Sequence, residues 1–148
     1  MCLIVQSREP KIAEKDIICY KLVKYWEDAD VYVSPLQHFP IASSRKIIGF
    51  IQKDDSDYSR VYPGIITRKT LDYNVSRGFL HTFMYLKSAK HIISKVSNKS
   101  EYRIFKCIIP KGVNYYEGYS KSTLCGNIIH VKGLASKELI YKEEIPCV

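Results

Sequence analysis

Alternation of apolar and polar residues marks most of this chain as strand rather than helix. Residues 16–25 combine β-branched and aromatic side chains with partial alternation. Residues 31–34 follow them after an acidic, turn-prone stretch, so we expect a hairpin. The same kind of run recurs through the rest of the chain. The pattern predicts strands over residues 16–25, 31–34, 45–53, 61–67, 78–83, 102–109, 113–119, 126–131 and 138–142.

One segment, at about 86–97, repeats its apolar residues at spacings of three and four instead. Its apolar positions share one face of an α-helix, and its opposite face is basic and polar. Asn98 and the polar residues after it supply a C-terminal stop. The apolar face comprises Leu86, Ala89, Ile92, Ile93 and Val96, and the polar face comprises Lys87, Lys90, His91, Ser94 and Lys95.

One main helix among about eight strands predicts a β-rich α+β fold with a curved, mostly antiparallel sheet and the helix on one face. The 148 residues suit a single domain over 1–148, without an internal repeat, a low-complexity segment or a linker. Gly49 is expected to mark a bulge within its strand. The proline-containing stretch 34–44 and the polar stretch 53–59 are expected to be loops, and a polar stretch at 67–77 leads into the strand at 78–83.

Composition narrows the class of protein. Hydrophobic residues make up 46% of the chain and charged residues 26%, which is typical of a globular protein. No apolar run approaches the roughly 20 residues of a membrane span, and the N-terminus lacks the basic region and cleavage site of a secretory signal. We therefore expect a soluble cytoplasmic protein that does not bind membranes.

The five cysteines do not form a recognisable site. Their number is odd and no C-x-x-C pair occurs, so neither a disulfide framework nor a structural zinc site is supported. Cys19 and Cys107 lie inside apolar runs, where cysteine usually behaves as a small buried hydrophobe. Cys2 precedes an apolar triplet that looks like the start of a buried strand. We expect neither a metal nor a cofactor.

Charge and tyrosine content both point to an anionic partner. The formal net charge is +8, and the basic residues are spread along the chain without a basic tail. A concave basic pocket and a diffuse basic surface are equally compatible with that spread. The chain also contains 12 tyrosines, whose rings can stack on a base while Lys and Arg hold phosphates. Any single tyrosine is more often a half-buried strand residue.

The junction between the predicted strand and the predicted helix, within residues 77–98, is the best candidate for a ligand site. His81 and Thr82 stand just before the helix, whose N-terminus presents free N–H groups and a partial positive charge to an anion. Glu117 is the most plausible catalytic carboxylate if the protein is an enzyme. The candidate ligand-binding residues are Lys21, Arg45, Arg77, His81, Thr82, Lys87, Tyr115 and Tyr116.

Two resemblances bear on function. The run GFLHTFMYLKSAKHI resembles the middle motif of ADP-ribosyltransferase-like folds, and CYKLVK followed by VYVSP resembles their first two strands. Family members usually place Arg or His on the first strand, where Cys19, Tyr20 and Lys21 stand here, so the resemblance implies that transferase chemistry is absent or altered. Residues 17–118 also resemble small uncharacterised proteins of bacteriophages and prophages, which implies a role against host defence in the host cytoplasm.

The sequence thus favours a non-enzymatic protein that sequesters a small anionic nucleotide-derived ligand and so counters host immune signalling. An ADP-ribosyltransferase-like enzyme acting on NAD or a nucleotide is one alternative. A protein or nucleic-acid binding module is another, less favoured one, and it predicts a flat basic surface and a steep salt dependence. A homo-oligomer with a pocket shared between subunits is also compatible with the sequence.

Overall fold

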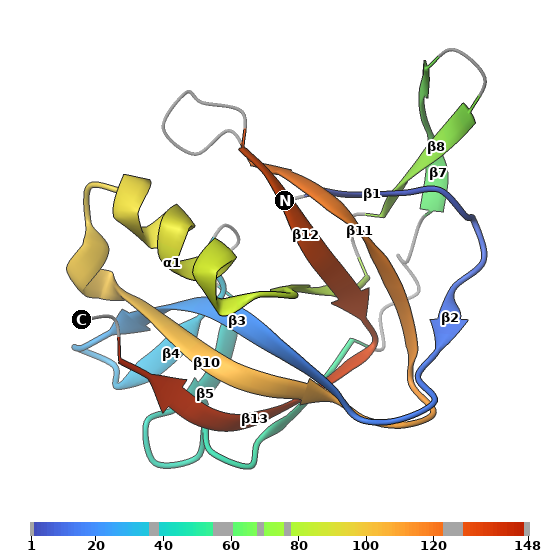
Figure 1. Cartoon of the computed structure of the whole chain (residues 1–148). Helices are drawn as coiled ribbons and strands as arrows, with labels where there is room; N and C mark the ends of the chain where they lie inside the picture. The colour runs from blue at the N-terminus through green and yellow to red at the C-terminus, as the bar shows by residue number, and fades with distance from the viewer. Residues whose placement is uncertain are drawn as a thin grey trace.

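The computed structural model describes residues 2–35, 39–54, 61–67, 70–75, 78–122 and 129–146. It shows one large sheet with a single α-helix among the described residues (Figure 1). The strands are β1 (Cys2–Val5), β2 (Lys11–Ile12), β3 (Ile17–Trp26), β4 (Val31–Val33), β5 (Pro40–Ser43), β6 (Ile51–Lys53), β7 (Val61–Thr67), β8 (Thr70–Val75), β9 (Leu80–Phe83), β10 (Tyr102–Ile109), β11 (Asn114–Ser122), β12 (Ile129–Ser136) and β13 (Glu138–Ile145). The helix α1 is Leu86–Lys95, and a 3₁₀ turn, η1, covers Lys99–Glu101.

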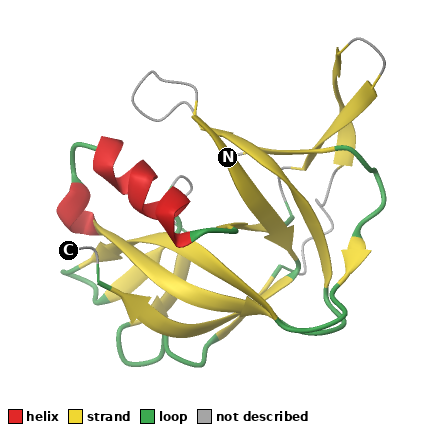
Figure 2. Ribbon diagram, viewed as in Figure 1, coloured by secondary structure: helices red, strands yellow, loops and turns green. Residues whose placement is uncertain are grey.

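Among the described residues, all strand pairings are antiparallel. The strand order is β6-β13-β10-β3-β9-β12-β11-β1-β8-β7, with β4 and β5 continuing from β3 and β2 pairing with β11. The sheet bends strongly, so its β13-β10-β3 part and its β12-β11-β1 part lie at a steep angle to each other (Figure 2). Helix α1 lies in that angle. The described fold is therefore β-dominated, antiparallel and curved, as the sequence predicts.

Alternation along β3 and β10 divides their side chains between two faces of the sheet. On one face, Cys19 and Val23 join Phe105 and Cys107 in the largest core cluster. On the other face, Leu22 and Ile104 pack beneath α1 in a second cluster. A third cluster lies toward β1 and contains Leu3, Val5, Val75, Tyr116 and Ala135. Only the middle of β3 is covered on both faces, and there Cys19, Leu22 and Val23 are buried.

The helix forms where its period predicts. Ala89, Ile92 and Ile93 are buried, and Val96 caps the C-terminus with its backbone N–H on the carbonyl of Ile93. The predicted polar face is exposed at all five of its positions. Ser88 is also buried, which the hydrophobic pattern did not predict.

The predicted hairpin is confirmed by the pairing of β3 with β4, and β10 spans the predicted 102–109. The predicted strand over 45–53 is wrong for most of its length. Only Ile51–Lys53 is a strand, because residues 44–49 turn so that Ile47 can enter the core and Gly49 adopts a φ of +83°. The stretch 34–44, predicted as a loop, contains β5, and the polar stretch 67–77, for which no strand was predicted, contains β8.

Gly118 is required where two strands come close. A Cβ at this position of β11 would lie 2.1 Å from the carbonyl oxygen of Ile4 in β1, a distance that no side chain can accept. The glycine therefore allows β1 to join the sheet at the edge of the third core cluster.

Candidate functional site

Three of the predicted site residues come together where β3 meets β9. Lys21 projects into the largest core cluster, its residue is only 9% exposed, and its Nζ donates to the carbonyl oxygen of His81 at 2.8 Å. Burial lowers the pKa of Lys21 below its ordinary value of 10.5, and the nearby thiols of Cys107 and Cys19 oppose that shift. The amino group of Lys21 is therefore buried and serves as a hydrogen-bond donor to a strand carbonyl oxygen.

Two buried thiols lie beside this lysine. Cys19 and Cys107 face each other directly across β3 and β10, and both are free. Burial raises the pKa of Cys19 from 9.0 to about 12, against a hydrogen bond with the Thr82 side chain, and burial also raises the pKa of Cys107. Both thiols stay protonated at neutral pH. They behave as the small buried hydrophobes that the sequence predicts, not as nucleophiles.

His81 and Thr82 occupy opposite faces of β9. The Thr82 hydroxyl donates to the carbonyl oxygen of Leu134 at 3.5 Å and is buried. His81 is partly exposed on the face that carries α1 and lies opposite Ala135 of β12. The structure thus divides this adjacent pair between the core and the surface.

Tyr115 and Tyr116 also point to opposite faces of their strand, β11. Tyr116 is buried, donates its hydroxyl to the carbonyl oxygen of Arg8 at 2.7 Å and contacts the ring of Phe79 at a centroid distance of 5.3 Å. Tyr115 packs against the largest core cluster. Burial and the hydrogen bond to Arg8 make Tyr116 a core residue. Tyr116 and His81 lie in the strands on either side of β12, both opposite Ala135, so about 10 Å of sheet separates these two candidates.

Glu117, the candidate catalytic carboxylate, lies between two lysines. Its oxygens lie 3.4 Å from Nζ of Lys11 and 3.9 Å from Nζ of Lys132. In the sheet register, Leu134 separates Glu117 from Thr82, so no candidate site residue adjoins the carboxylate in its row. The geometry gives Glu117 an ion-pairing role.

The remaining candidates lie at separate places. Arg45 is exposed in the turn after β5, where its charge acts on Asp30, and Lys87 is exposed on α1. Arg77 lies outside the described residues. The predicted set is thus divided between the β3–β9 contact, β11, a turn and the helix.

A different feature, the exposed face of α1, stands out as a coherent basic surface. Lys87, Lys90 and Lys95 lie along it with His91, and all are exposed. Tyr85 caps the helix N-terminus without a side-chain hydrogen bond, and Nζ of Lys87 lies 5.7 Å from the centre of its ring. The sequence pattern had located this face but treated it as the flank of a pocket at the helix N-terminus.

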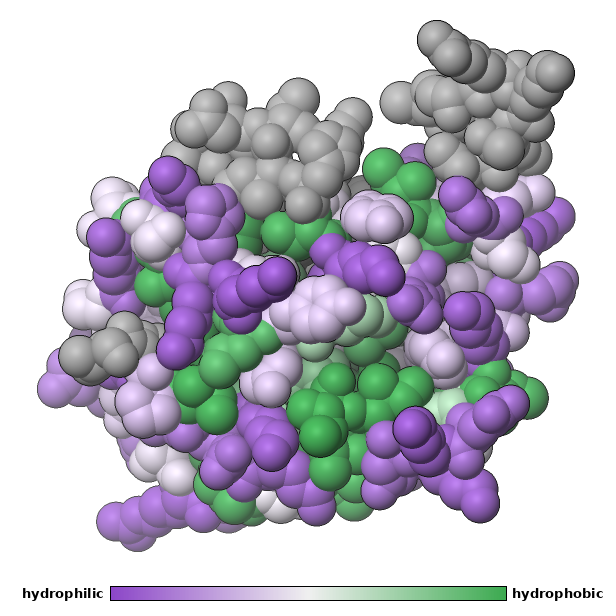
Figure 3. All heavy atoms as spheres, in the orientation of Figure 1, coloured by the Kyte–Doolittle hydropathy of each residue, from purple (hydrophilic) through white to green (hydrophobic). Residues whose placement is uncertain are grey.

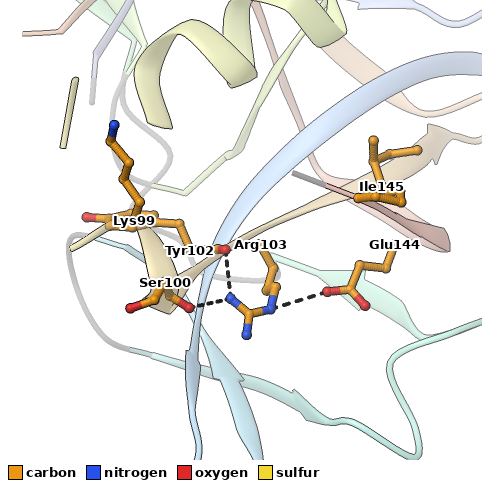
Figure 4. A pocket seen from close by; sticks show the side chains of 7 residues that line it. Lys99, Ser100, Tyr102, Arg103, Glu144 and Ile145 are labelled. Carbon is orange, nitrogen blue, oxygen red and sulfur yellow. Dashed lines mark hydrogen bonds and ion pairs between the residues drawn. The ribbon is translucent and has the colours of Figure 1, made fainter. Parts of the chain in front are cut away.

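A shallow depression of about 530 Å³ lies beyond the C-terminal end of α1 (Figure 4). Arg103 projects across it and donates from Nη1 to the carbonyl oxygens of Ser100 at 2.5 Å and Tyr102 at 2.9 Å. Its Nε lies 3.4 Å from Oε1 of Glu144. The guanidinium ties η1 to β13 and so acts as a structural cation. The lining residues are Lys99, Ser100, Tyr102, Arg103, Glu144, Ile145 and Pro146.

Within the part of the chain that the structure describes, no group of three His, Cys, Asp or Glu residues could hold a metal ion. No described helix has the length and apolar character needed to cross a membrane. No protein-family model, curated protein or solved structure matches the chain.

Proposed function

We propose that this protein is a non-enzymatic binding protein for an extended, phosphate-bearing nucleotide chain, and that the exposed face of α1 supplies the main contact surface. The observation that carries the proposal is the row of Lys87, Lys90 and Lys95 on that face. Lysine ammonium groups bind phosphates as point charges, and they determine affinity without reading sequence.

The segment that contains α1 is basic in sequence. Residues 73–100 contain five Lys and Arg residues and no Asp or Glu, although the whole chain contains 15 acidic residues. The field of this region therefore concentrates at the helix, where it would attract a polyanion.

The shape of the surface favours an extended ligand over a small one. At about 1.5 Å per residue, Lys87 and Lys95 lie about 12 Å apart along the helix axis. A nucleic acid strand carries one phosphate per roughly 3.4 Å of duplex axis, so such a row can meet several phosphates. Tyr85, which is 45% exposed next to Lys87, adds a ring on which a base can stack. To enclose a small ligand, several side chains must point into one cavity. These lysines instead lie along the convex outer surface of a helix.

The test is a fluorescence anisotropy titration of a labelled oligonucleotide of about 20 nucleotides, single-stranded and duplex, at several salt concentrations. The variant Lys87→Gln/Lys90→Gln/Lys95→Gln should bind at least about tenfold more weakly, with a salt slope smaller by about 2 to 3. A matched control removes three exposed lysines elsewhere, at Lys15, Lys46 and Lys142. It should leave affinity within about threefold.

Equal losses in both triple variants would contradict the assignment to α1, because they would mean that net charge alone drives binding. Competition by mononucleotides, cyclic dinucleotides and ADP-ribose separates the two ligand sizes. If one of them binds tightly with little salt dependence and the oligonucleotide does not, the sequestering of a small nucleotide-derived ligand replaces this proposal.

The narrower sequence-based hypotheses stay predictions. They are the α+β class, the resemblance to bacteriophage proteins with its role against host defence, and the ADP-ribosyltransferase-like pattern. An assay for NAD consumption with wild type and Glu117→Gln tests the enzymatic alternative, since turnover that depends on Glu117 would contradict a purely binding role.

A further inference from the structure

Two aromatic rings with almost equal exposure lie near the two ends of α1. Tyr85 directly precedes the helix and is 45% exposed, and Trp26, the last residue of β3, is 44% exposed. Trp26 lies toward the C-terminal end of α1, because η1, which follows the helix, contacts β3. Exposure alone would allow a base to stack on either ring.

The charges beside the two rings have opposite signs. Nζ of Lys87 lies 5.7 Å from the centre of the Tyr85 ring, and the lysine row of α1 continues from there. Glu27 and Asp28 directly follow Trp26, and both are exposed. Each base of a nucleic acid is attached to a phosphate, so carboxylates beside Trp26 repel the strand that lysines beside Tyr85 attract. Tyr85 is therefore the ring that a bound strand can supply with a base.

The Tyr85 ring has little use within the fold. Met84 and Leu86, its two neighbours in the chain, pack against the core clusters, and the clusters of the described residues do not include Tyr85. Tyr85 occupies the N-cap position of α1 but makes no side-chain cap hydrogen bond. Ser, Thr, Asp or Asn would cap the helix better. A residue that departs from such a local rule without a structural gain is expected at functional sites.

Stacking on Tyr85 requires an unpaired base. Inside a duplex, neighbouring base pairs cover both faces of each base, so an external ring gains stacking energy only from a single strand. Helix α1 is also poorly placed to enter a major groove, because it lies in the angle of the sheet and packs with Phe83 of β9 and Val131 of β12 (Figure 2). Hydrophilic side chains gather over α1 in the space-filling view, where a flexible strand can lie along them (Figure 3).

We propose that the α1 surface binds single strands in preference to duplexes, and that Tyr85 determines this preference by stacking on a base. The inference rests on the proposed function, in which the lysines of α1 hold the phosphates. Lys87 and Lys95 span about 12 Å, which corresponds to about four phosphates at roughly 3.4 Å each. The site takes a strand of about that length without reading its sequence, because every base has a face that can stack.

Fluorescence anisotropy with a labelled oligothymidylate and a duplex of equal length measures the preference. Tyr85→Ala should weaken binding of the single strand at least about fivefold and binding of the duplex less than about twofold. Tyr85→Phe keeps the ring and should stay within about twofold of wild type for both. Trp26→Ala is the matched control, since it removes an equally exposed ring, and it should change neither affinity more than about twofold.

Tryptophan fluorescence reports the stacking itself. The chain contains one tryptophan, so the variant Trp26→Phe/Tyr85→Trp moves the only indole to position 85. Unlabelled oligothymidylate should quench the emission of this variant, because a base stacks on the indole, and the duplex should not. The emission of wild type, whose indole is at Trp26, should change little with either ligand.

Equal losses of single-strand and duplex binding in Tyr85→Ala would overturn this inference, and so would quenching confined to Trp26 of wild type. Either result leaves binding by the lysines of α1 intact. If Lys87→Gln/Lys90→Gln/Lys95→Gln instead loses no more affinity than the control triple variant, the proposed function fails and this inference fails with it. Circular dichroism of each variant verifies that the fold is retained.

Discussion

Two halves of one sheet face have similar sequences and opposite surroundings. Beneath α1, Leu22 is 5% exposed and Ile104 is 0% exposed. Four residues further along the same two strands, and on the same face, Ile18 is 50% exposed and its partner Ile108 is partly exposed. The strands, the alternation and the residue types continue unchanged from one half to the other. Exposure thus depends on whether another element covers the face.

This difference has an energetic consequence. Full burial of an isoleucine or leucine side chain stabilises a protein by about 1.5 to 3 kcal/mol, so the covered half contributes to folding. Ile18 and Ile51 contribute much less, because each keeps about half of its surface in water.

The largest expected effect on stability comes from truncating an isoleucine to alanine beneath α1, compared with the same change in the uncovered half of the face. Ile104→Ala should lower the free energy of unfolding by about 2 to 4 kcal/mol, because it opens a cavity beneath α1. Ile18→Ala should lower it by less than about 1 kcal/mol. Urea unfolding measures both values. Equal losses would mean that Ile18 is as well buried as Ile104.

A smaller effect is expected on the reverse face of the covered half, where Lys21 lies among apolar side chains. Lys21→Met should lower the free energy of unfolding by about 1 to 3 kcal/mol at pH 7, because the carbonyl oxygen of His81 loses its buried donor. Chemical unfolding measures this loss. Lys24→Met, at a less buried position of the same strand, serves as the control and should lose less.

The lowered pKa of Lys21 adds a pH dependence with a definite sign. Between that lowered value and the ordinary 10.5, the unfolded chain binds more protons at this residue than the folded chain does. Wild type therefore gains stability relative to Lys21→Met as the pH rises through this window, and it loses that gain as the pH falls. A difference between the two proteins that narrows as the pH rises toward 10.5 would contradict the lowered pKa of Lys21.

The smallest effect on stability is expected on the outer face of α1. Lys87→Gln/Lys90→Gln/Lys95→Gln should change the free energy of unfolding by less than about 1 kcal/mol in total, because these side chains are exposed and glutamine is also a good helix former. Thermal unfolding followed by circular dichroism measures this. A large loss would mean that the lysines support the helix, and the binding experiment would then need single substitutions.

Strongly patterned segments were predictable, and segments whose partners decide their state were not. The period of α1 and the apolar runs of β3 and β10 led directly to the observed elements. By contrast, most of 45–53 is not a strand, because residues 44–49 turn so that Ile47 enters the core. Thr70–Val75 was counted within a polar stretch but is β8; its apolar residues Leu71, Tyr73 and Val75 alternate with polar ones, a short strand pattern that was missed.

The candidate site shows the same limit. Residue types drew attention to Lys21, Thr82 and Tyr116, but polar and aromatic side chains serve the protein interior as well as ligand sites. Each of these three side chains is buried and hydrogen-bonded to a backbone carbonyl oxygen. A sequence without an alignment gives no signal that separates these two uses.

The sequence by itself determined the β-dominated class, the position of the helix and the identity of its basic face, because these follow from local periodicity and charge. Only the tertiary structure decided which half of a sheet face α1 covers and that Ile51, Ile140, Ile108 and Ile18 align into one row. Strand register, and which element packs on a sheet face, depend on contacts between residues far apart in the chain. Side-chain alternation shows which residues share a face but not what packs on it.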